Sequence, residues 1–244
     1  MKKITVIMQG PVYDNWTASF YQRYQEMSFV ERVILSTWKG EKFVKGDVIY
    51  NSKPDYSGIH NRNYQIVSSY NGILKSETEI CLKVRSDMFL PNLEQMLRFF
   101  LDNDQNQIYT LSIYPRFVFH PRDHVFLGTT ENLKTMFNIP LDYEKCSQLN
   151  PSSNYVRTET YIGVWWYAKQ EPKIENYIAE PINYLMDNSP KRNEALEVYH
   201  KLIRENKGFL PFPRIPIEWP KHYPEGYPFE KLKIYGEIYH GENL

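Results

Sequence analysis

"ICLKVRSDMFL", residues 80–90, is the stretch from which the fold of this 244-residue chain can be read. Its apolar residues predict a buried strand whose end carries Lys83, Arg85 and Asp87 out of the sheet. Because Lys83 and Arg85 are two positions apart, both should point to the same face of the strand. Asp87 then has two interpretations. It is either a partner in a salt bridge at the end of a strand or a carboxylate that holds a divalent metal ion and a phosphate.

Strand and helix signals alternate through the first part of the chain. Short β-branched segments predict strands, and apolar residues three or four positions apart predict helices. The predicted strands are residues 4–9, 31–38, 46–51 and 78–86, and the predicted helices are 16–27, 61–77 and 90–102. This alternation predicts an α/β fold with a mainly parallel sheet flanked by helices. In such sheets, ligands bind beyond the C-terminal ends of the strands.

The second part of the chain departs from this simple alternation. Residues 107–129 are rich in β-forming residues but contain two prolines. Helices are predicted at 156–169, 174–187 and 191–206. The tail at 209–230 is so dense in proline and aromatic residues that we expect irregular structure packed against the body. The length of the chain favours one domain over 1–244.

Composition narrows the function classes. Lysine plus arginine and aspartate plus glutamate number 29 each, so the chain has no net charge and no nucleic-acid partner is expected. Aromatic residues make up 16% of the chain. Tyrosine suits the recognition of sugars and bases, although an A/T-rich genome enriches tyrosine as well.

The sequence also predicts where the protein works. Cys81 and Cys146 are far apart, which is typical of a reducing compartment. The apolar run near the N-terminus breaks after about five residues, too short for a signal peptide. No stretch approaches the roughly 18 apolar residues of a membrane span. We therefore expect a soluble cytoplasmic protein, and peripheral contact with the inner face of the membrane is left open.

Polar residues follow all four predicted strands of the first part, at Gln9, Ser36-Thr37, Asn51 and Arg85-Ser86-Asp87. Since the carboxyl ends of parallel strands meet at one edge, these side chains should lie together. The helix predicted at 61–77 opens with Asn-Arg-Asn, and helix N-termini favour phosphate or sugar hydroxyl groups. Asn61 is equally well placed as a plain N-cap, whereas Arg62 is unfavourable in a first helical turn.

Two further groups of residues in the second part have chemical potential. His120, Arg122, Asp123 and His124 lie close together in the sequence, but Pro121 excludes the regular helix that an i, i+4 zinc site needs. Acid–base chemistry or binding of an acceptor hydroxyl is the better interpretation of this group.

The second group, Arg157 and Glu159, begins a predicted helix. Glu159 is either an acid favoured by the helix dipole or a base that deprotonates an acceptor hydroxyl.

The segments "IMQGPV", "VILSTW", "NRNYQIVSSYNGI" and "LKVRSDMF", in this order, resemble the WavE-type bacterial surface-polysaccharide proteins, a group related to glycosyltransferases of the GT-A fold. The motifs span roughly residues 4–165. The resemblance implies a nucleotide-binding half at 1–105 and an acceptor-binding half with a C-terminal wrap at 106–244. It implies transfer of a sugar from a nucleotide sugar to a hydroxyl of a growing capsule or lipopolysaccharide. Inversion is favoured because candidate bases are present and no nucleophile with its own supporting partners is evident. The acceptor would be a saccharide or a lipid-linked saccharide.

The resemblance also implies roles for individual residues. It places "QGPV" near the base or ribose, the helix that begins "NRN" near the diphosphate, and Asp87 where GT-A proteins carry a DXD motif for Mn²⁺ or Mg²⁺. The position two before Asp87 is Arg85 rather than aspartate, so Arg85 is a candidate to replace part of the metal charge. The donor-binding set is Gln9, Gly10, Pro11, Thr37, Asn61, Arg62, Asn63, Lys83, Arg85 and Ser86; the acceptor-binding set is His120, Arg122, His124 and Arg157; the candidate bases are Glu159 and Asp123; the metal ligands are Asp87 and His240.

Two other functions stay in view. A sugar nucleotidyltransferase would want a glycine-rich first loop with a basic residue, whereas "MQGPVYDNW" at 8–16 has one glycine and no lysine or arginine. A non-catalytic carbohydrate-binding protein would leave the polar strand ends unexplained.

Overall fold

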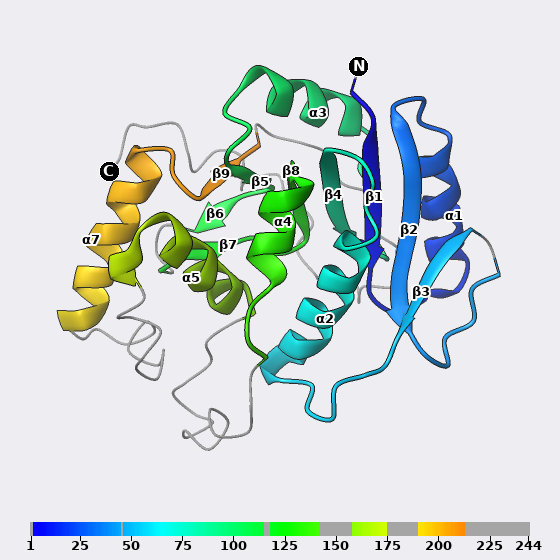
Figure 1. The fold of residues 1–244 in the computed structure, drawn as a ribbon, viewed down its shortest axis with the longest axis horizontal. Coiled ribbons are helices and arrows are strands. Elements are labelled where there is room, and N and C mark those ends of the chain that lie inside the picture. Colours follow the sequence, from blue (N-terminus) through cyan, green and yellow to red (C-terminus); the bar gives the residue numbers. More distant parts are fainter. Residues whose placement is uncertain (1, 45, 115–117, 142–157, 175–189, 213–244) are drawn as a thin grey trace, which may run out of the picture.

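The computed structural model describes residues 2–44, 46–114, 118–141, 158–174 and 190–212. Within these ranges a seven-stranded sheet of order β3-β2-β1-β4-β8-β5-β9 forms the centre of the molecule (Figure 1). Its strands are β1 (Ile4–Gln9), β2 (Val30–Trp38), β3 (Asp47–Asn51), β4 (Ile80–Arg85), β5 (Ile108–Thr110), β8 (Val125–Thr129) and β9 (Phe209–Pro211). A second, two-stranded sheet pairs β6 (Ile113–Tyr114) with β7 (His120–Pro121).

Helices cover both faces of the large sheet (Figure 1). They are α1 (Asp14–Gln25), α2 (Arg62–Ile73), α3 (Leu93–Asp102), α4 (Thr130–Phe137), α5 (Thr158–Gln170) and α7 (Pro190–Arg204), with short 3₁₀ turns η1 (Ile59–Asn61) and η3 (Pro172–Ile174). Apolar residues of α1 and α3 pack on one face, and those of α2, α4, α5 and α7 pack on the other. None of the helices that the structure describes has the length and apolar character needed to cross a membrane.

The pairing of the strands confirms a mixed, mainly parallel sheet. β1 runs parallel to β2 and to β4, and β2 runs parallel to β3. β8 then enters antiparallel to both β4 and β5, and β9 adds parallel to β5. Every residue of β1 is buried, which explains why this strand is a continuous apolar run rather than an alternating one.

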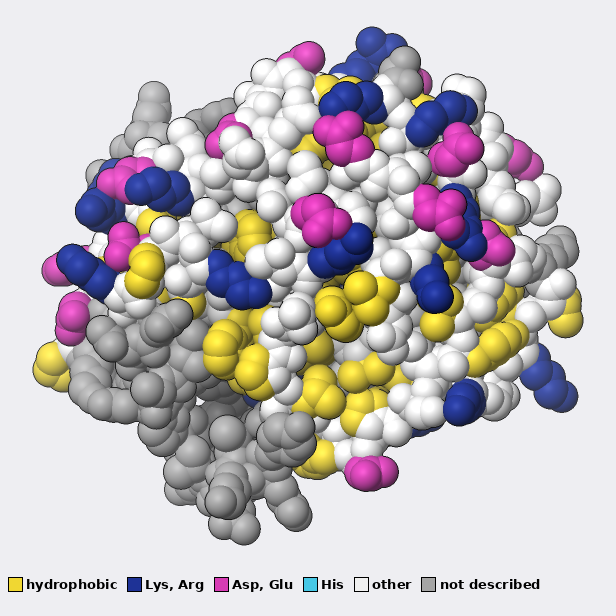
Figure 2. All heavy atoms as spheres, viewed as in Figure 1, with side chains coloured by type: hydrophobic (Ala, Val, Ile, Leu, Met, Phe, Trp, Pro, Cys, Tyr) yellow, Lys and Arg dark blue, Asp and Glu magenta, His cyan; other side chains and the backbone are white. Residues whose placement is uncertain are grey.

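Charged side chains on the face drawn in Figure 2 are mixed in sign, with Lys and Arg beside Asp and Glu. Arg98 and Glu94 on α3 form an exposed ion pair, and so do Lys134 and Glu131 on α4. Such pairs contribute little to stability because water screens them.

Three sequence predictions need correction. Helix α2 ends at Ile73, four residues before the predicted end, and Ser76 and Thr78 after it bond to each other and to Thr130. Helix α4 was not predicted; Thr129 caps it by accepting a hydrogen bond from the Asn132 amide. The prediction of irregular structure was wrong for residues 209–211, because they form a strand that pairs in parallel with β5. Residues 175–187 of the helix predicted at 174–187, and the tail after residue 212, lie outside the described residues.

Close approach of α2 to the sheet depends on Gly72. A Cβ atom at this position would lie 2.4 Å from Cγ2 of Ile7 and 3.1 Å from Cβ of Ser36. Replacement of Gly72 by any larger residue must therefore push α2 away from β1 and β2. Since the N-terminal end of α2 lies near the C-terminal ends of the strands, this contact also positions the residues before the helix.

Gly72→Ala should lower the free energy of unfolding by about 1–3 kcal/mol through overpacking, although alanine is the better residue in most helix interiors. Urea denaturation measures this loss. Ile7→Ala removes the atom in the way, so the double variant should be less destabilised than the sum of the two single changes. Additive effects, or a stabilising Gly72→Ala, would show that α2 does not pack as described.

Candidate functional site

A pocket of about 330 Å³ lies beyond the C-terminal ends of β1 and β4, between these strand ends and the beginning of α2. The chain builds β2 and β3 on one side of β1 and β4 on the other. The pocket therefore lies where the order of the strands reverses, the usual ligand position in open α/β sheets. It is lined by Gln9, Gly10, Pro11, Tyr13, Trp38, Glu41, Lys53, His60, Asn61, Tyr64, Gln65, Arg85, Ser86, Asp87 and Asp123.

The pocket wall between β1 and β4 is held by two hydrogen bonds of Ser86, one from its backbone and one from its side chain. The Ser86 amide donates to the carbonyl of Gln9 at 2.9 Å, and Ser86 Oγ donates to the carbonyl of Pro11 at 2.6 Å. Gly10 has φ +132°, and a Cβ there would lie 2.7 Å from Ser86 Oγ. The "QGP" turn and Ser86 are thus one packed unit, and only glycine fits at its centre.

Arg85 and Asp87 form a two-pronged ion pair on the pocket wall. Arg85 Nε donates to Asp87 Oδ1 at 2.9 Å, and Nη2 donates to Oδ2 at 2.7 Å. The Asp87 side chain is 1% exposed, whereas that of Arg85 is 31% exposed. The pocket therefore presents the cation, and the carboxylate supports it from behind. Next to this pair, burial raises the pKa of the Tyr13 phenol, Asp87 adds to the effect and Arg85 opposes it.

Lys83 lies fully buried behind the pocket, and its Nζ donates to the backbone carbonyl of Asp123 at 2.6 Å. Burial lowers the pKa of Lys83 to about 8, and attraction to Asp123 limits the shift. Burial alone would raise the pKa of Asp123, but the charges of His124 and Lys83 and a hydrogen bond from Gln65 bring it below its ordinary value. Burial lowers the pKa of His124 to about 3, so at neutral pH the cations that stabilise the Asp123 carboxylate are Lys83 and Arg85.

Aromatic side chains that the sequence analysis did not select form another wall. The ring centroids of Trp38 and Tyr64 are 5.0 Å apart, and Lys53 Nζ lies 5.9 Å from the Tyr64 ring centroid. His60 and Asn61 precede α2 with left-handed backbones, at φ 53° and 61°. Asn61 occupies the N-cap position of α2, but its side chain makes no capping hydrogen bond. The plain N-cap interpretation of Asn61 therefore does not describe this helix.

Several predicted donor-binding residues lie outside the lining of the pocket. Arg62 is buried, and its guanidinium carbon lies 4.4 Å from the ring centroid of Tyr161 on α5. The side-chain Nδ2 of Asn63 donates to the carbonyl of Tyr56. Thr37 is buried in β2, and Lys83 is buried with its Nζ bonded to the backbone carbonyl of Asp123.

Among the four strand ends, the predicted polar side chains line the pocket at β1 and β4, whereas at the end of β2 the lining residue is Trp38. At the ends of β2 and β3, Asn51 Nδ2 donates to Ser36 Oγ at 3.0 Å and to the Thr37 carbonyl at 2.8 Å. Asn71 on α2 donates to Asn51 Oδ1, and Ser36 Oγ donates to the carbonyl of Ser68. These polar groups satisfy one another and fasten α2 to the sheet.

Of the described residues that were predicted to act on the acceptor, only Asp123 lines the pocket. Nδ1 of His120 lies 2.8 Å from Oγ1 of Thr160, so the His120 side chain faces α5. Arg122 fixes its segment through a backbone bond to the carbonyl of Ser112. Glu159 is half-buried in the first turn of α5 and His124 is half-buried beside Asp123. Arg157 and His240 lie outside the described residues.

A divalent metal does not fit the described residues as they stand. Within the described ranges, no three His, Cys, Asp or Glu side chains gather closely enough to hold a metal ion. Both carboxylate oxygens of Asp87 already accept hydrogen bonds from Arg85. The Mn²⁺ or Mg²⁺ predicted at Asp87 stays a prediction, as does its second ligand, His240.

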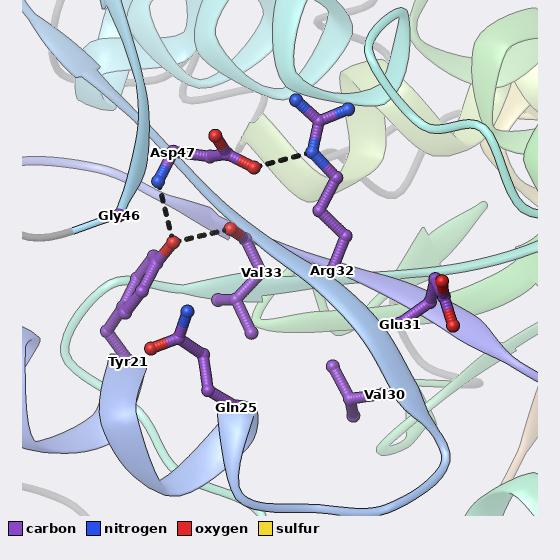
Figure 3. A pocket seen from close by; sticks show the side chains of 8 residues that line it. All are labelled: Tyr21, Gln25, Val30, Glu31, Arg32, Val33, Gly46 and Asp47. Carbon is purple, nitrogen blue, oxygen red and sulfur yellow. Dashed lines mark hydrogen bonds and ion pairs between the residues drawn. The ribbon is translucent and has the colours of Figure 1, made fainter.

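A second pocket, of about 270 Å³, lies at the opposite end of β2 and β3 (Figure 3). Tyr21 Oη donates to the Val33 carbonyl and accepts from the Asp47 amide, while Arg32 Nε donates to Asp47 Oδ2 at 2.6 Å. Arg32 also pairs with Glu77. These groups bond mainly to each other and lie at the amino ends of the strands, so this pocket is the weaker candidate.

Comparison with known proteins gives distant structural matches. No protein-family model and no curated protein sequence matches the chain. Mouse xyloside xylosyltransferase 1 aligns with a TM-score of 0.44 and 10% identity, over 87% of this chain and 86% of its own. CMP:2-keto-3-deoxy-manno-octonic acid synthetase in complex with CTP aligns with a TM-score of 0.40 and 13% identity, over 61% and 83%. The glycosyltransferase GlyE of Streptococcus pneumoniae TIGR4 aligns with a TM-score of 0.39 and 13% identity, over 79% and 52%. Scores this low carry no information about activity, and the resemblance to WavE-type proteins remains a prediction.

The burial of Lys83 should be visible in the pH dependence of stability. The folded state releases the Lys83 proton near pH 8, while the unfolded chain holds it to about pH 10.5. The unfolded state then binds more protons in this window, so the contribution of Lys83 to stability rises with pH. Relative to Lys83→Met, wild-type protein should gain up to about 3 kcal/mol between pH 8 and 10.5.

Denaturant unfolding at several pH values measures this difference. Lys75→Met, at an exposed lysine after α2, is the matched control and should follow the wild-type pH dependence. A constant difference between wild type and Lys83→Met across the window would show that Lys83 is not buried as a titrating cation.

Proposed function

We propose that this protein is a glycosyltransferase that moves a sugar from a nucleotide-sugar donor to a hydroxyl of a growing bacterial capsule or lipopolysaccharide. The observation that carries the proposal is the pocket, because it combines an exposed guanidinium, a buried carboxylate, and an aromatic wall at the carboxyl ends of β1 and β4. The sequence resemblance to WavE-type proteins supplies the substrate class. The acceptor is a saccharide or a lipid-linked saccharide, and the protein works in the cytoplasm or at the inner face of the membrane.

The donor has a natural orientation in this pocket. The Trp38–Tyr64 wall offers flat faces for a base or a sugar ring. The phosphates fit at Arg85 and at the N-terminal end of α2, where the helix dipole favours negative charge. In the proposed orientation the reacting sugar lies toward Asp123, a carboxylate that lines the same pocket.

The reaction that these groups support is a single displacement. The acceptor oxygen attacks the anomeric carbon, the bond from that carbon to the phosphate oxygen breaks, and its electron pair leaves with the phosphate. Arg85 stabilises the charge that develops on the leaving oxygens. The Asp123 carboxylate takes the proton from the acceptor hydroxyl. One displacement inverts the anomeric configuration.

Asp123 is the better base because it faces the pocket, whereas Glu159 is absent from the lining. The nearby charges of Lys83 and Arg85 keep the Asp123 carboxylate ionised at neutral pH and ready to accept a proton. A nucleotidyltransferase remains the second candidate. Against it, the first loop, which contains Gly10 and Pro11, has no lysine or arginine to hold a nucleoside triphosphate.

A panel of nucleotide sugars should identify the donor through a rise in melting temperature. A donor at about a hundred times its Kd stabilises the folded state by about 2.7 kcal/mol. For a chain of this size, that stabilisation raises the melting temperature by about 5–11 °C. The same donor should be hydrolysed slowly when no acceptor is present. If no nucleotide sugar changes the melting temperature, the proposed function is wrong.

Asp123→Asn should keep donor binding but lose transfer or donor hydrolysis by about 10²–10⁴-fold, since it removes the base. Glu159→Gln is the matched control, with an equal change of charge on α5, and should retain most of the activity. The reverse pattern would assign the base to Glu159. Pyrophosphate release from a nucleoside triphosphate and a sugar phosphate would instead favour the nucleotidyltransferase.

A further inference from the structure

The residue that the resemblance assigns to a metal is already neutralised by a side chain. Each oxygen of the Asp87 carboxylate accepts a bond from the same guanidinium, at 2.9 and 2.7 Å. A Mg²⁺ ion needs its oxygen ligands at about 2.0–2.1 Å in octahedral geometry. An ion shared by both oxygens of Asp87 would occupy the place of Arg85. Metal binding in that position requires the breaking of a two-pronged pair with a buried carboxylate.

The same geometry makes Arg85 a pre-positioned cation. Asp87 holds one edge of the guanidinium, and Tyr13 lies close enough to Arg85 to share a hydrogen bond. The next residue, Ser86, is fixed by its bonds to Gln9 and Pro11, so the backbone at the end of β4 cannot drift. Arginine matches the oxygens of a phosphate with two parallel bonds, which a lysine cannot do.

We propose that Arg85 takes the place of the divalent metal, so that this protein binds the diphosphate of a nucleotide without a metal ion. Asp87 is then a positioning residue, which aims the guanidinium into the pocket and does not ligate an ion. The proposal rests on the proposed function for the class of ligand, a nucleoside diphosphate. It goes beyond that function because it assigns the phosphate site to one side chain of this chain.

The test measures binding rather than turnover. Titration calorimetry of the full chain with UDP, GDP, CDP, ADP and dTDP is carried out in EDTA and again in Mn²⁺, with inorganic pyrophosphate as an additional probe. At least one nucleoside diphosphate should bind in EDTA, with a Kd within about threefold of that in Mn²⁺. Arg85→Lys should weaken this binding by about tenfold and leave it insensitive to EDTA, since the charge stays but the second parallel bond is lost.

Arg85→Asp reverses the charge and gives residues 85–87 the two acids of a DXD motif. This variant should lose binding in EDTA by at least about thirtyfold and regain a part of it in Mn²⁺. Arg98→Asp, at an exposed position on α3, is the matched control and should bind like wild type. If Arg85→Asp does not fold, Arg85→Gln replaces it, with an expected loss of at least about tenfold in EDTA.

The outcomes separate this inference from the proposed function. Binding of a nucleoside diphosphate only in Mn²⁺ overturns the metal-independent site and leaves the glycosyltransferase proposal intact. Binding of pyrophosphate alone in EDTA, lost in Arg85→Asp, supports the phosphate site and contradicts the nucleotide-sugar function. No binding of any probe under either condition overturns both.

Discussion

The parallel register between β1 and β4 is the constraint on which the site depends. It places Gln9 opposite Arg85, so that the two central strands end at the same level. Beyond this level the chain leaves β1 through Gly10 and leaves β4 through Ser86, and the two exits are bonded to each other. A shift of one residue would turn Arg85 to the opposite face of the sheet. It would also separate Ser86 from the "QGP" turn, and the pocket would lose its wall.

Three charged residues of one short segment have different roles because they lie at different depths. Lys83 is fully buried, so its charge must be compensated by the carbonyl of Asp123 and by nearby acids. Arg85 is two residues further on, at the rim, where a guanidinium can contact both Asp87 and solvent. Of the two interpretations of Asp87, the salt bridge with Arg85 is present in the structure, and the metal role stays a prediction for Asp87. Its salt bridge is structural, and through that salt bridge it determines what the pocket presents.

Much of the first part of the fold could be predicted because its strands are short apolar runs and its helices are periodic. Residues such as Gln9, Arg85 and Asp87 were visible because polar side chains interrupt apolar segments at strand ends. Trp38 and Tyr64 were not, since an aromatic residue at the end of a strand or in a helix resembles a core residue.

The positions of other residues depend on contacts that no local pattern contains. The Arg62 guanidinium packs on the ring of Tyr161, which lies far along the chain. Asn51, at the end of β3, accepts a hydrogen bond from Asn71 on α2. The left-handed backbones of His60 and Asn61 belong to the turn into α2. Asn and His adopt this conformation more readily than most residues, but their types alone do not predict it. Helix α4 escaped prediction because its few apolar residues follow a strand directly, with Thr129 both ending β8 and capping the helix.

The single antiparallel strand at the centre of the sheet explains why Asp123 reaches the site. Since β8 runs against β4, its beginning lies at the edge where the parallel strands end. Val125 pairs with Val84, so the residues just before β8 continue past the end of β4 and meet Arg85 and Ser86. A parallel strand in this place would have carried its preceding loop to the opposite edge. The reversal of one strand therefore brings a carboxylate from the second half of the chain to the pocket that Arg85 lines from the first.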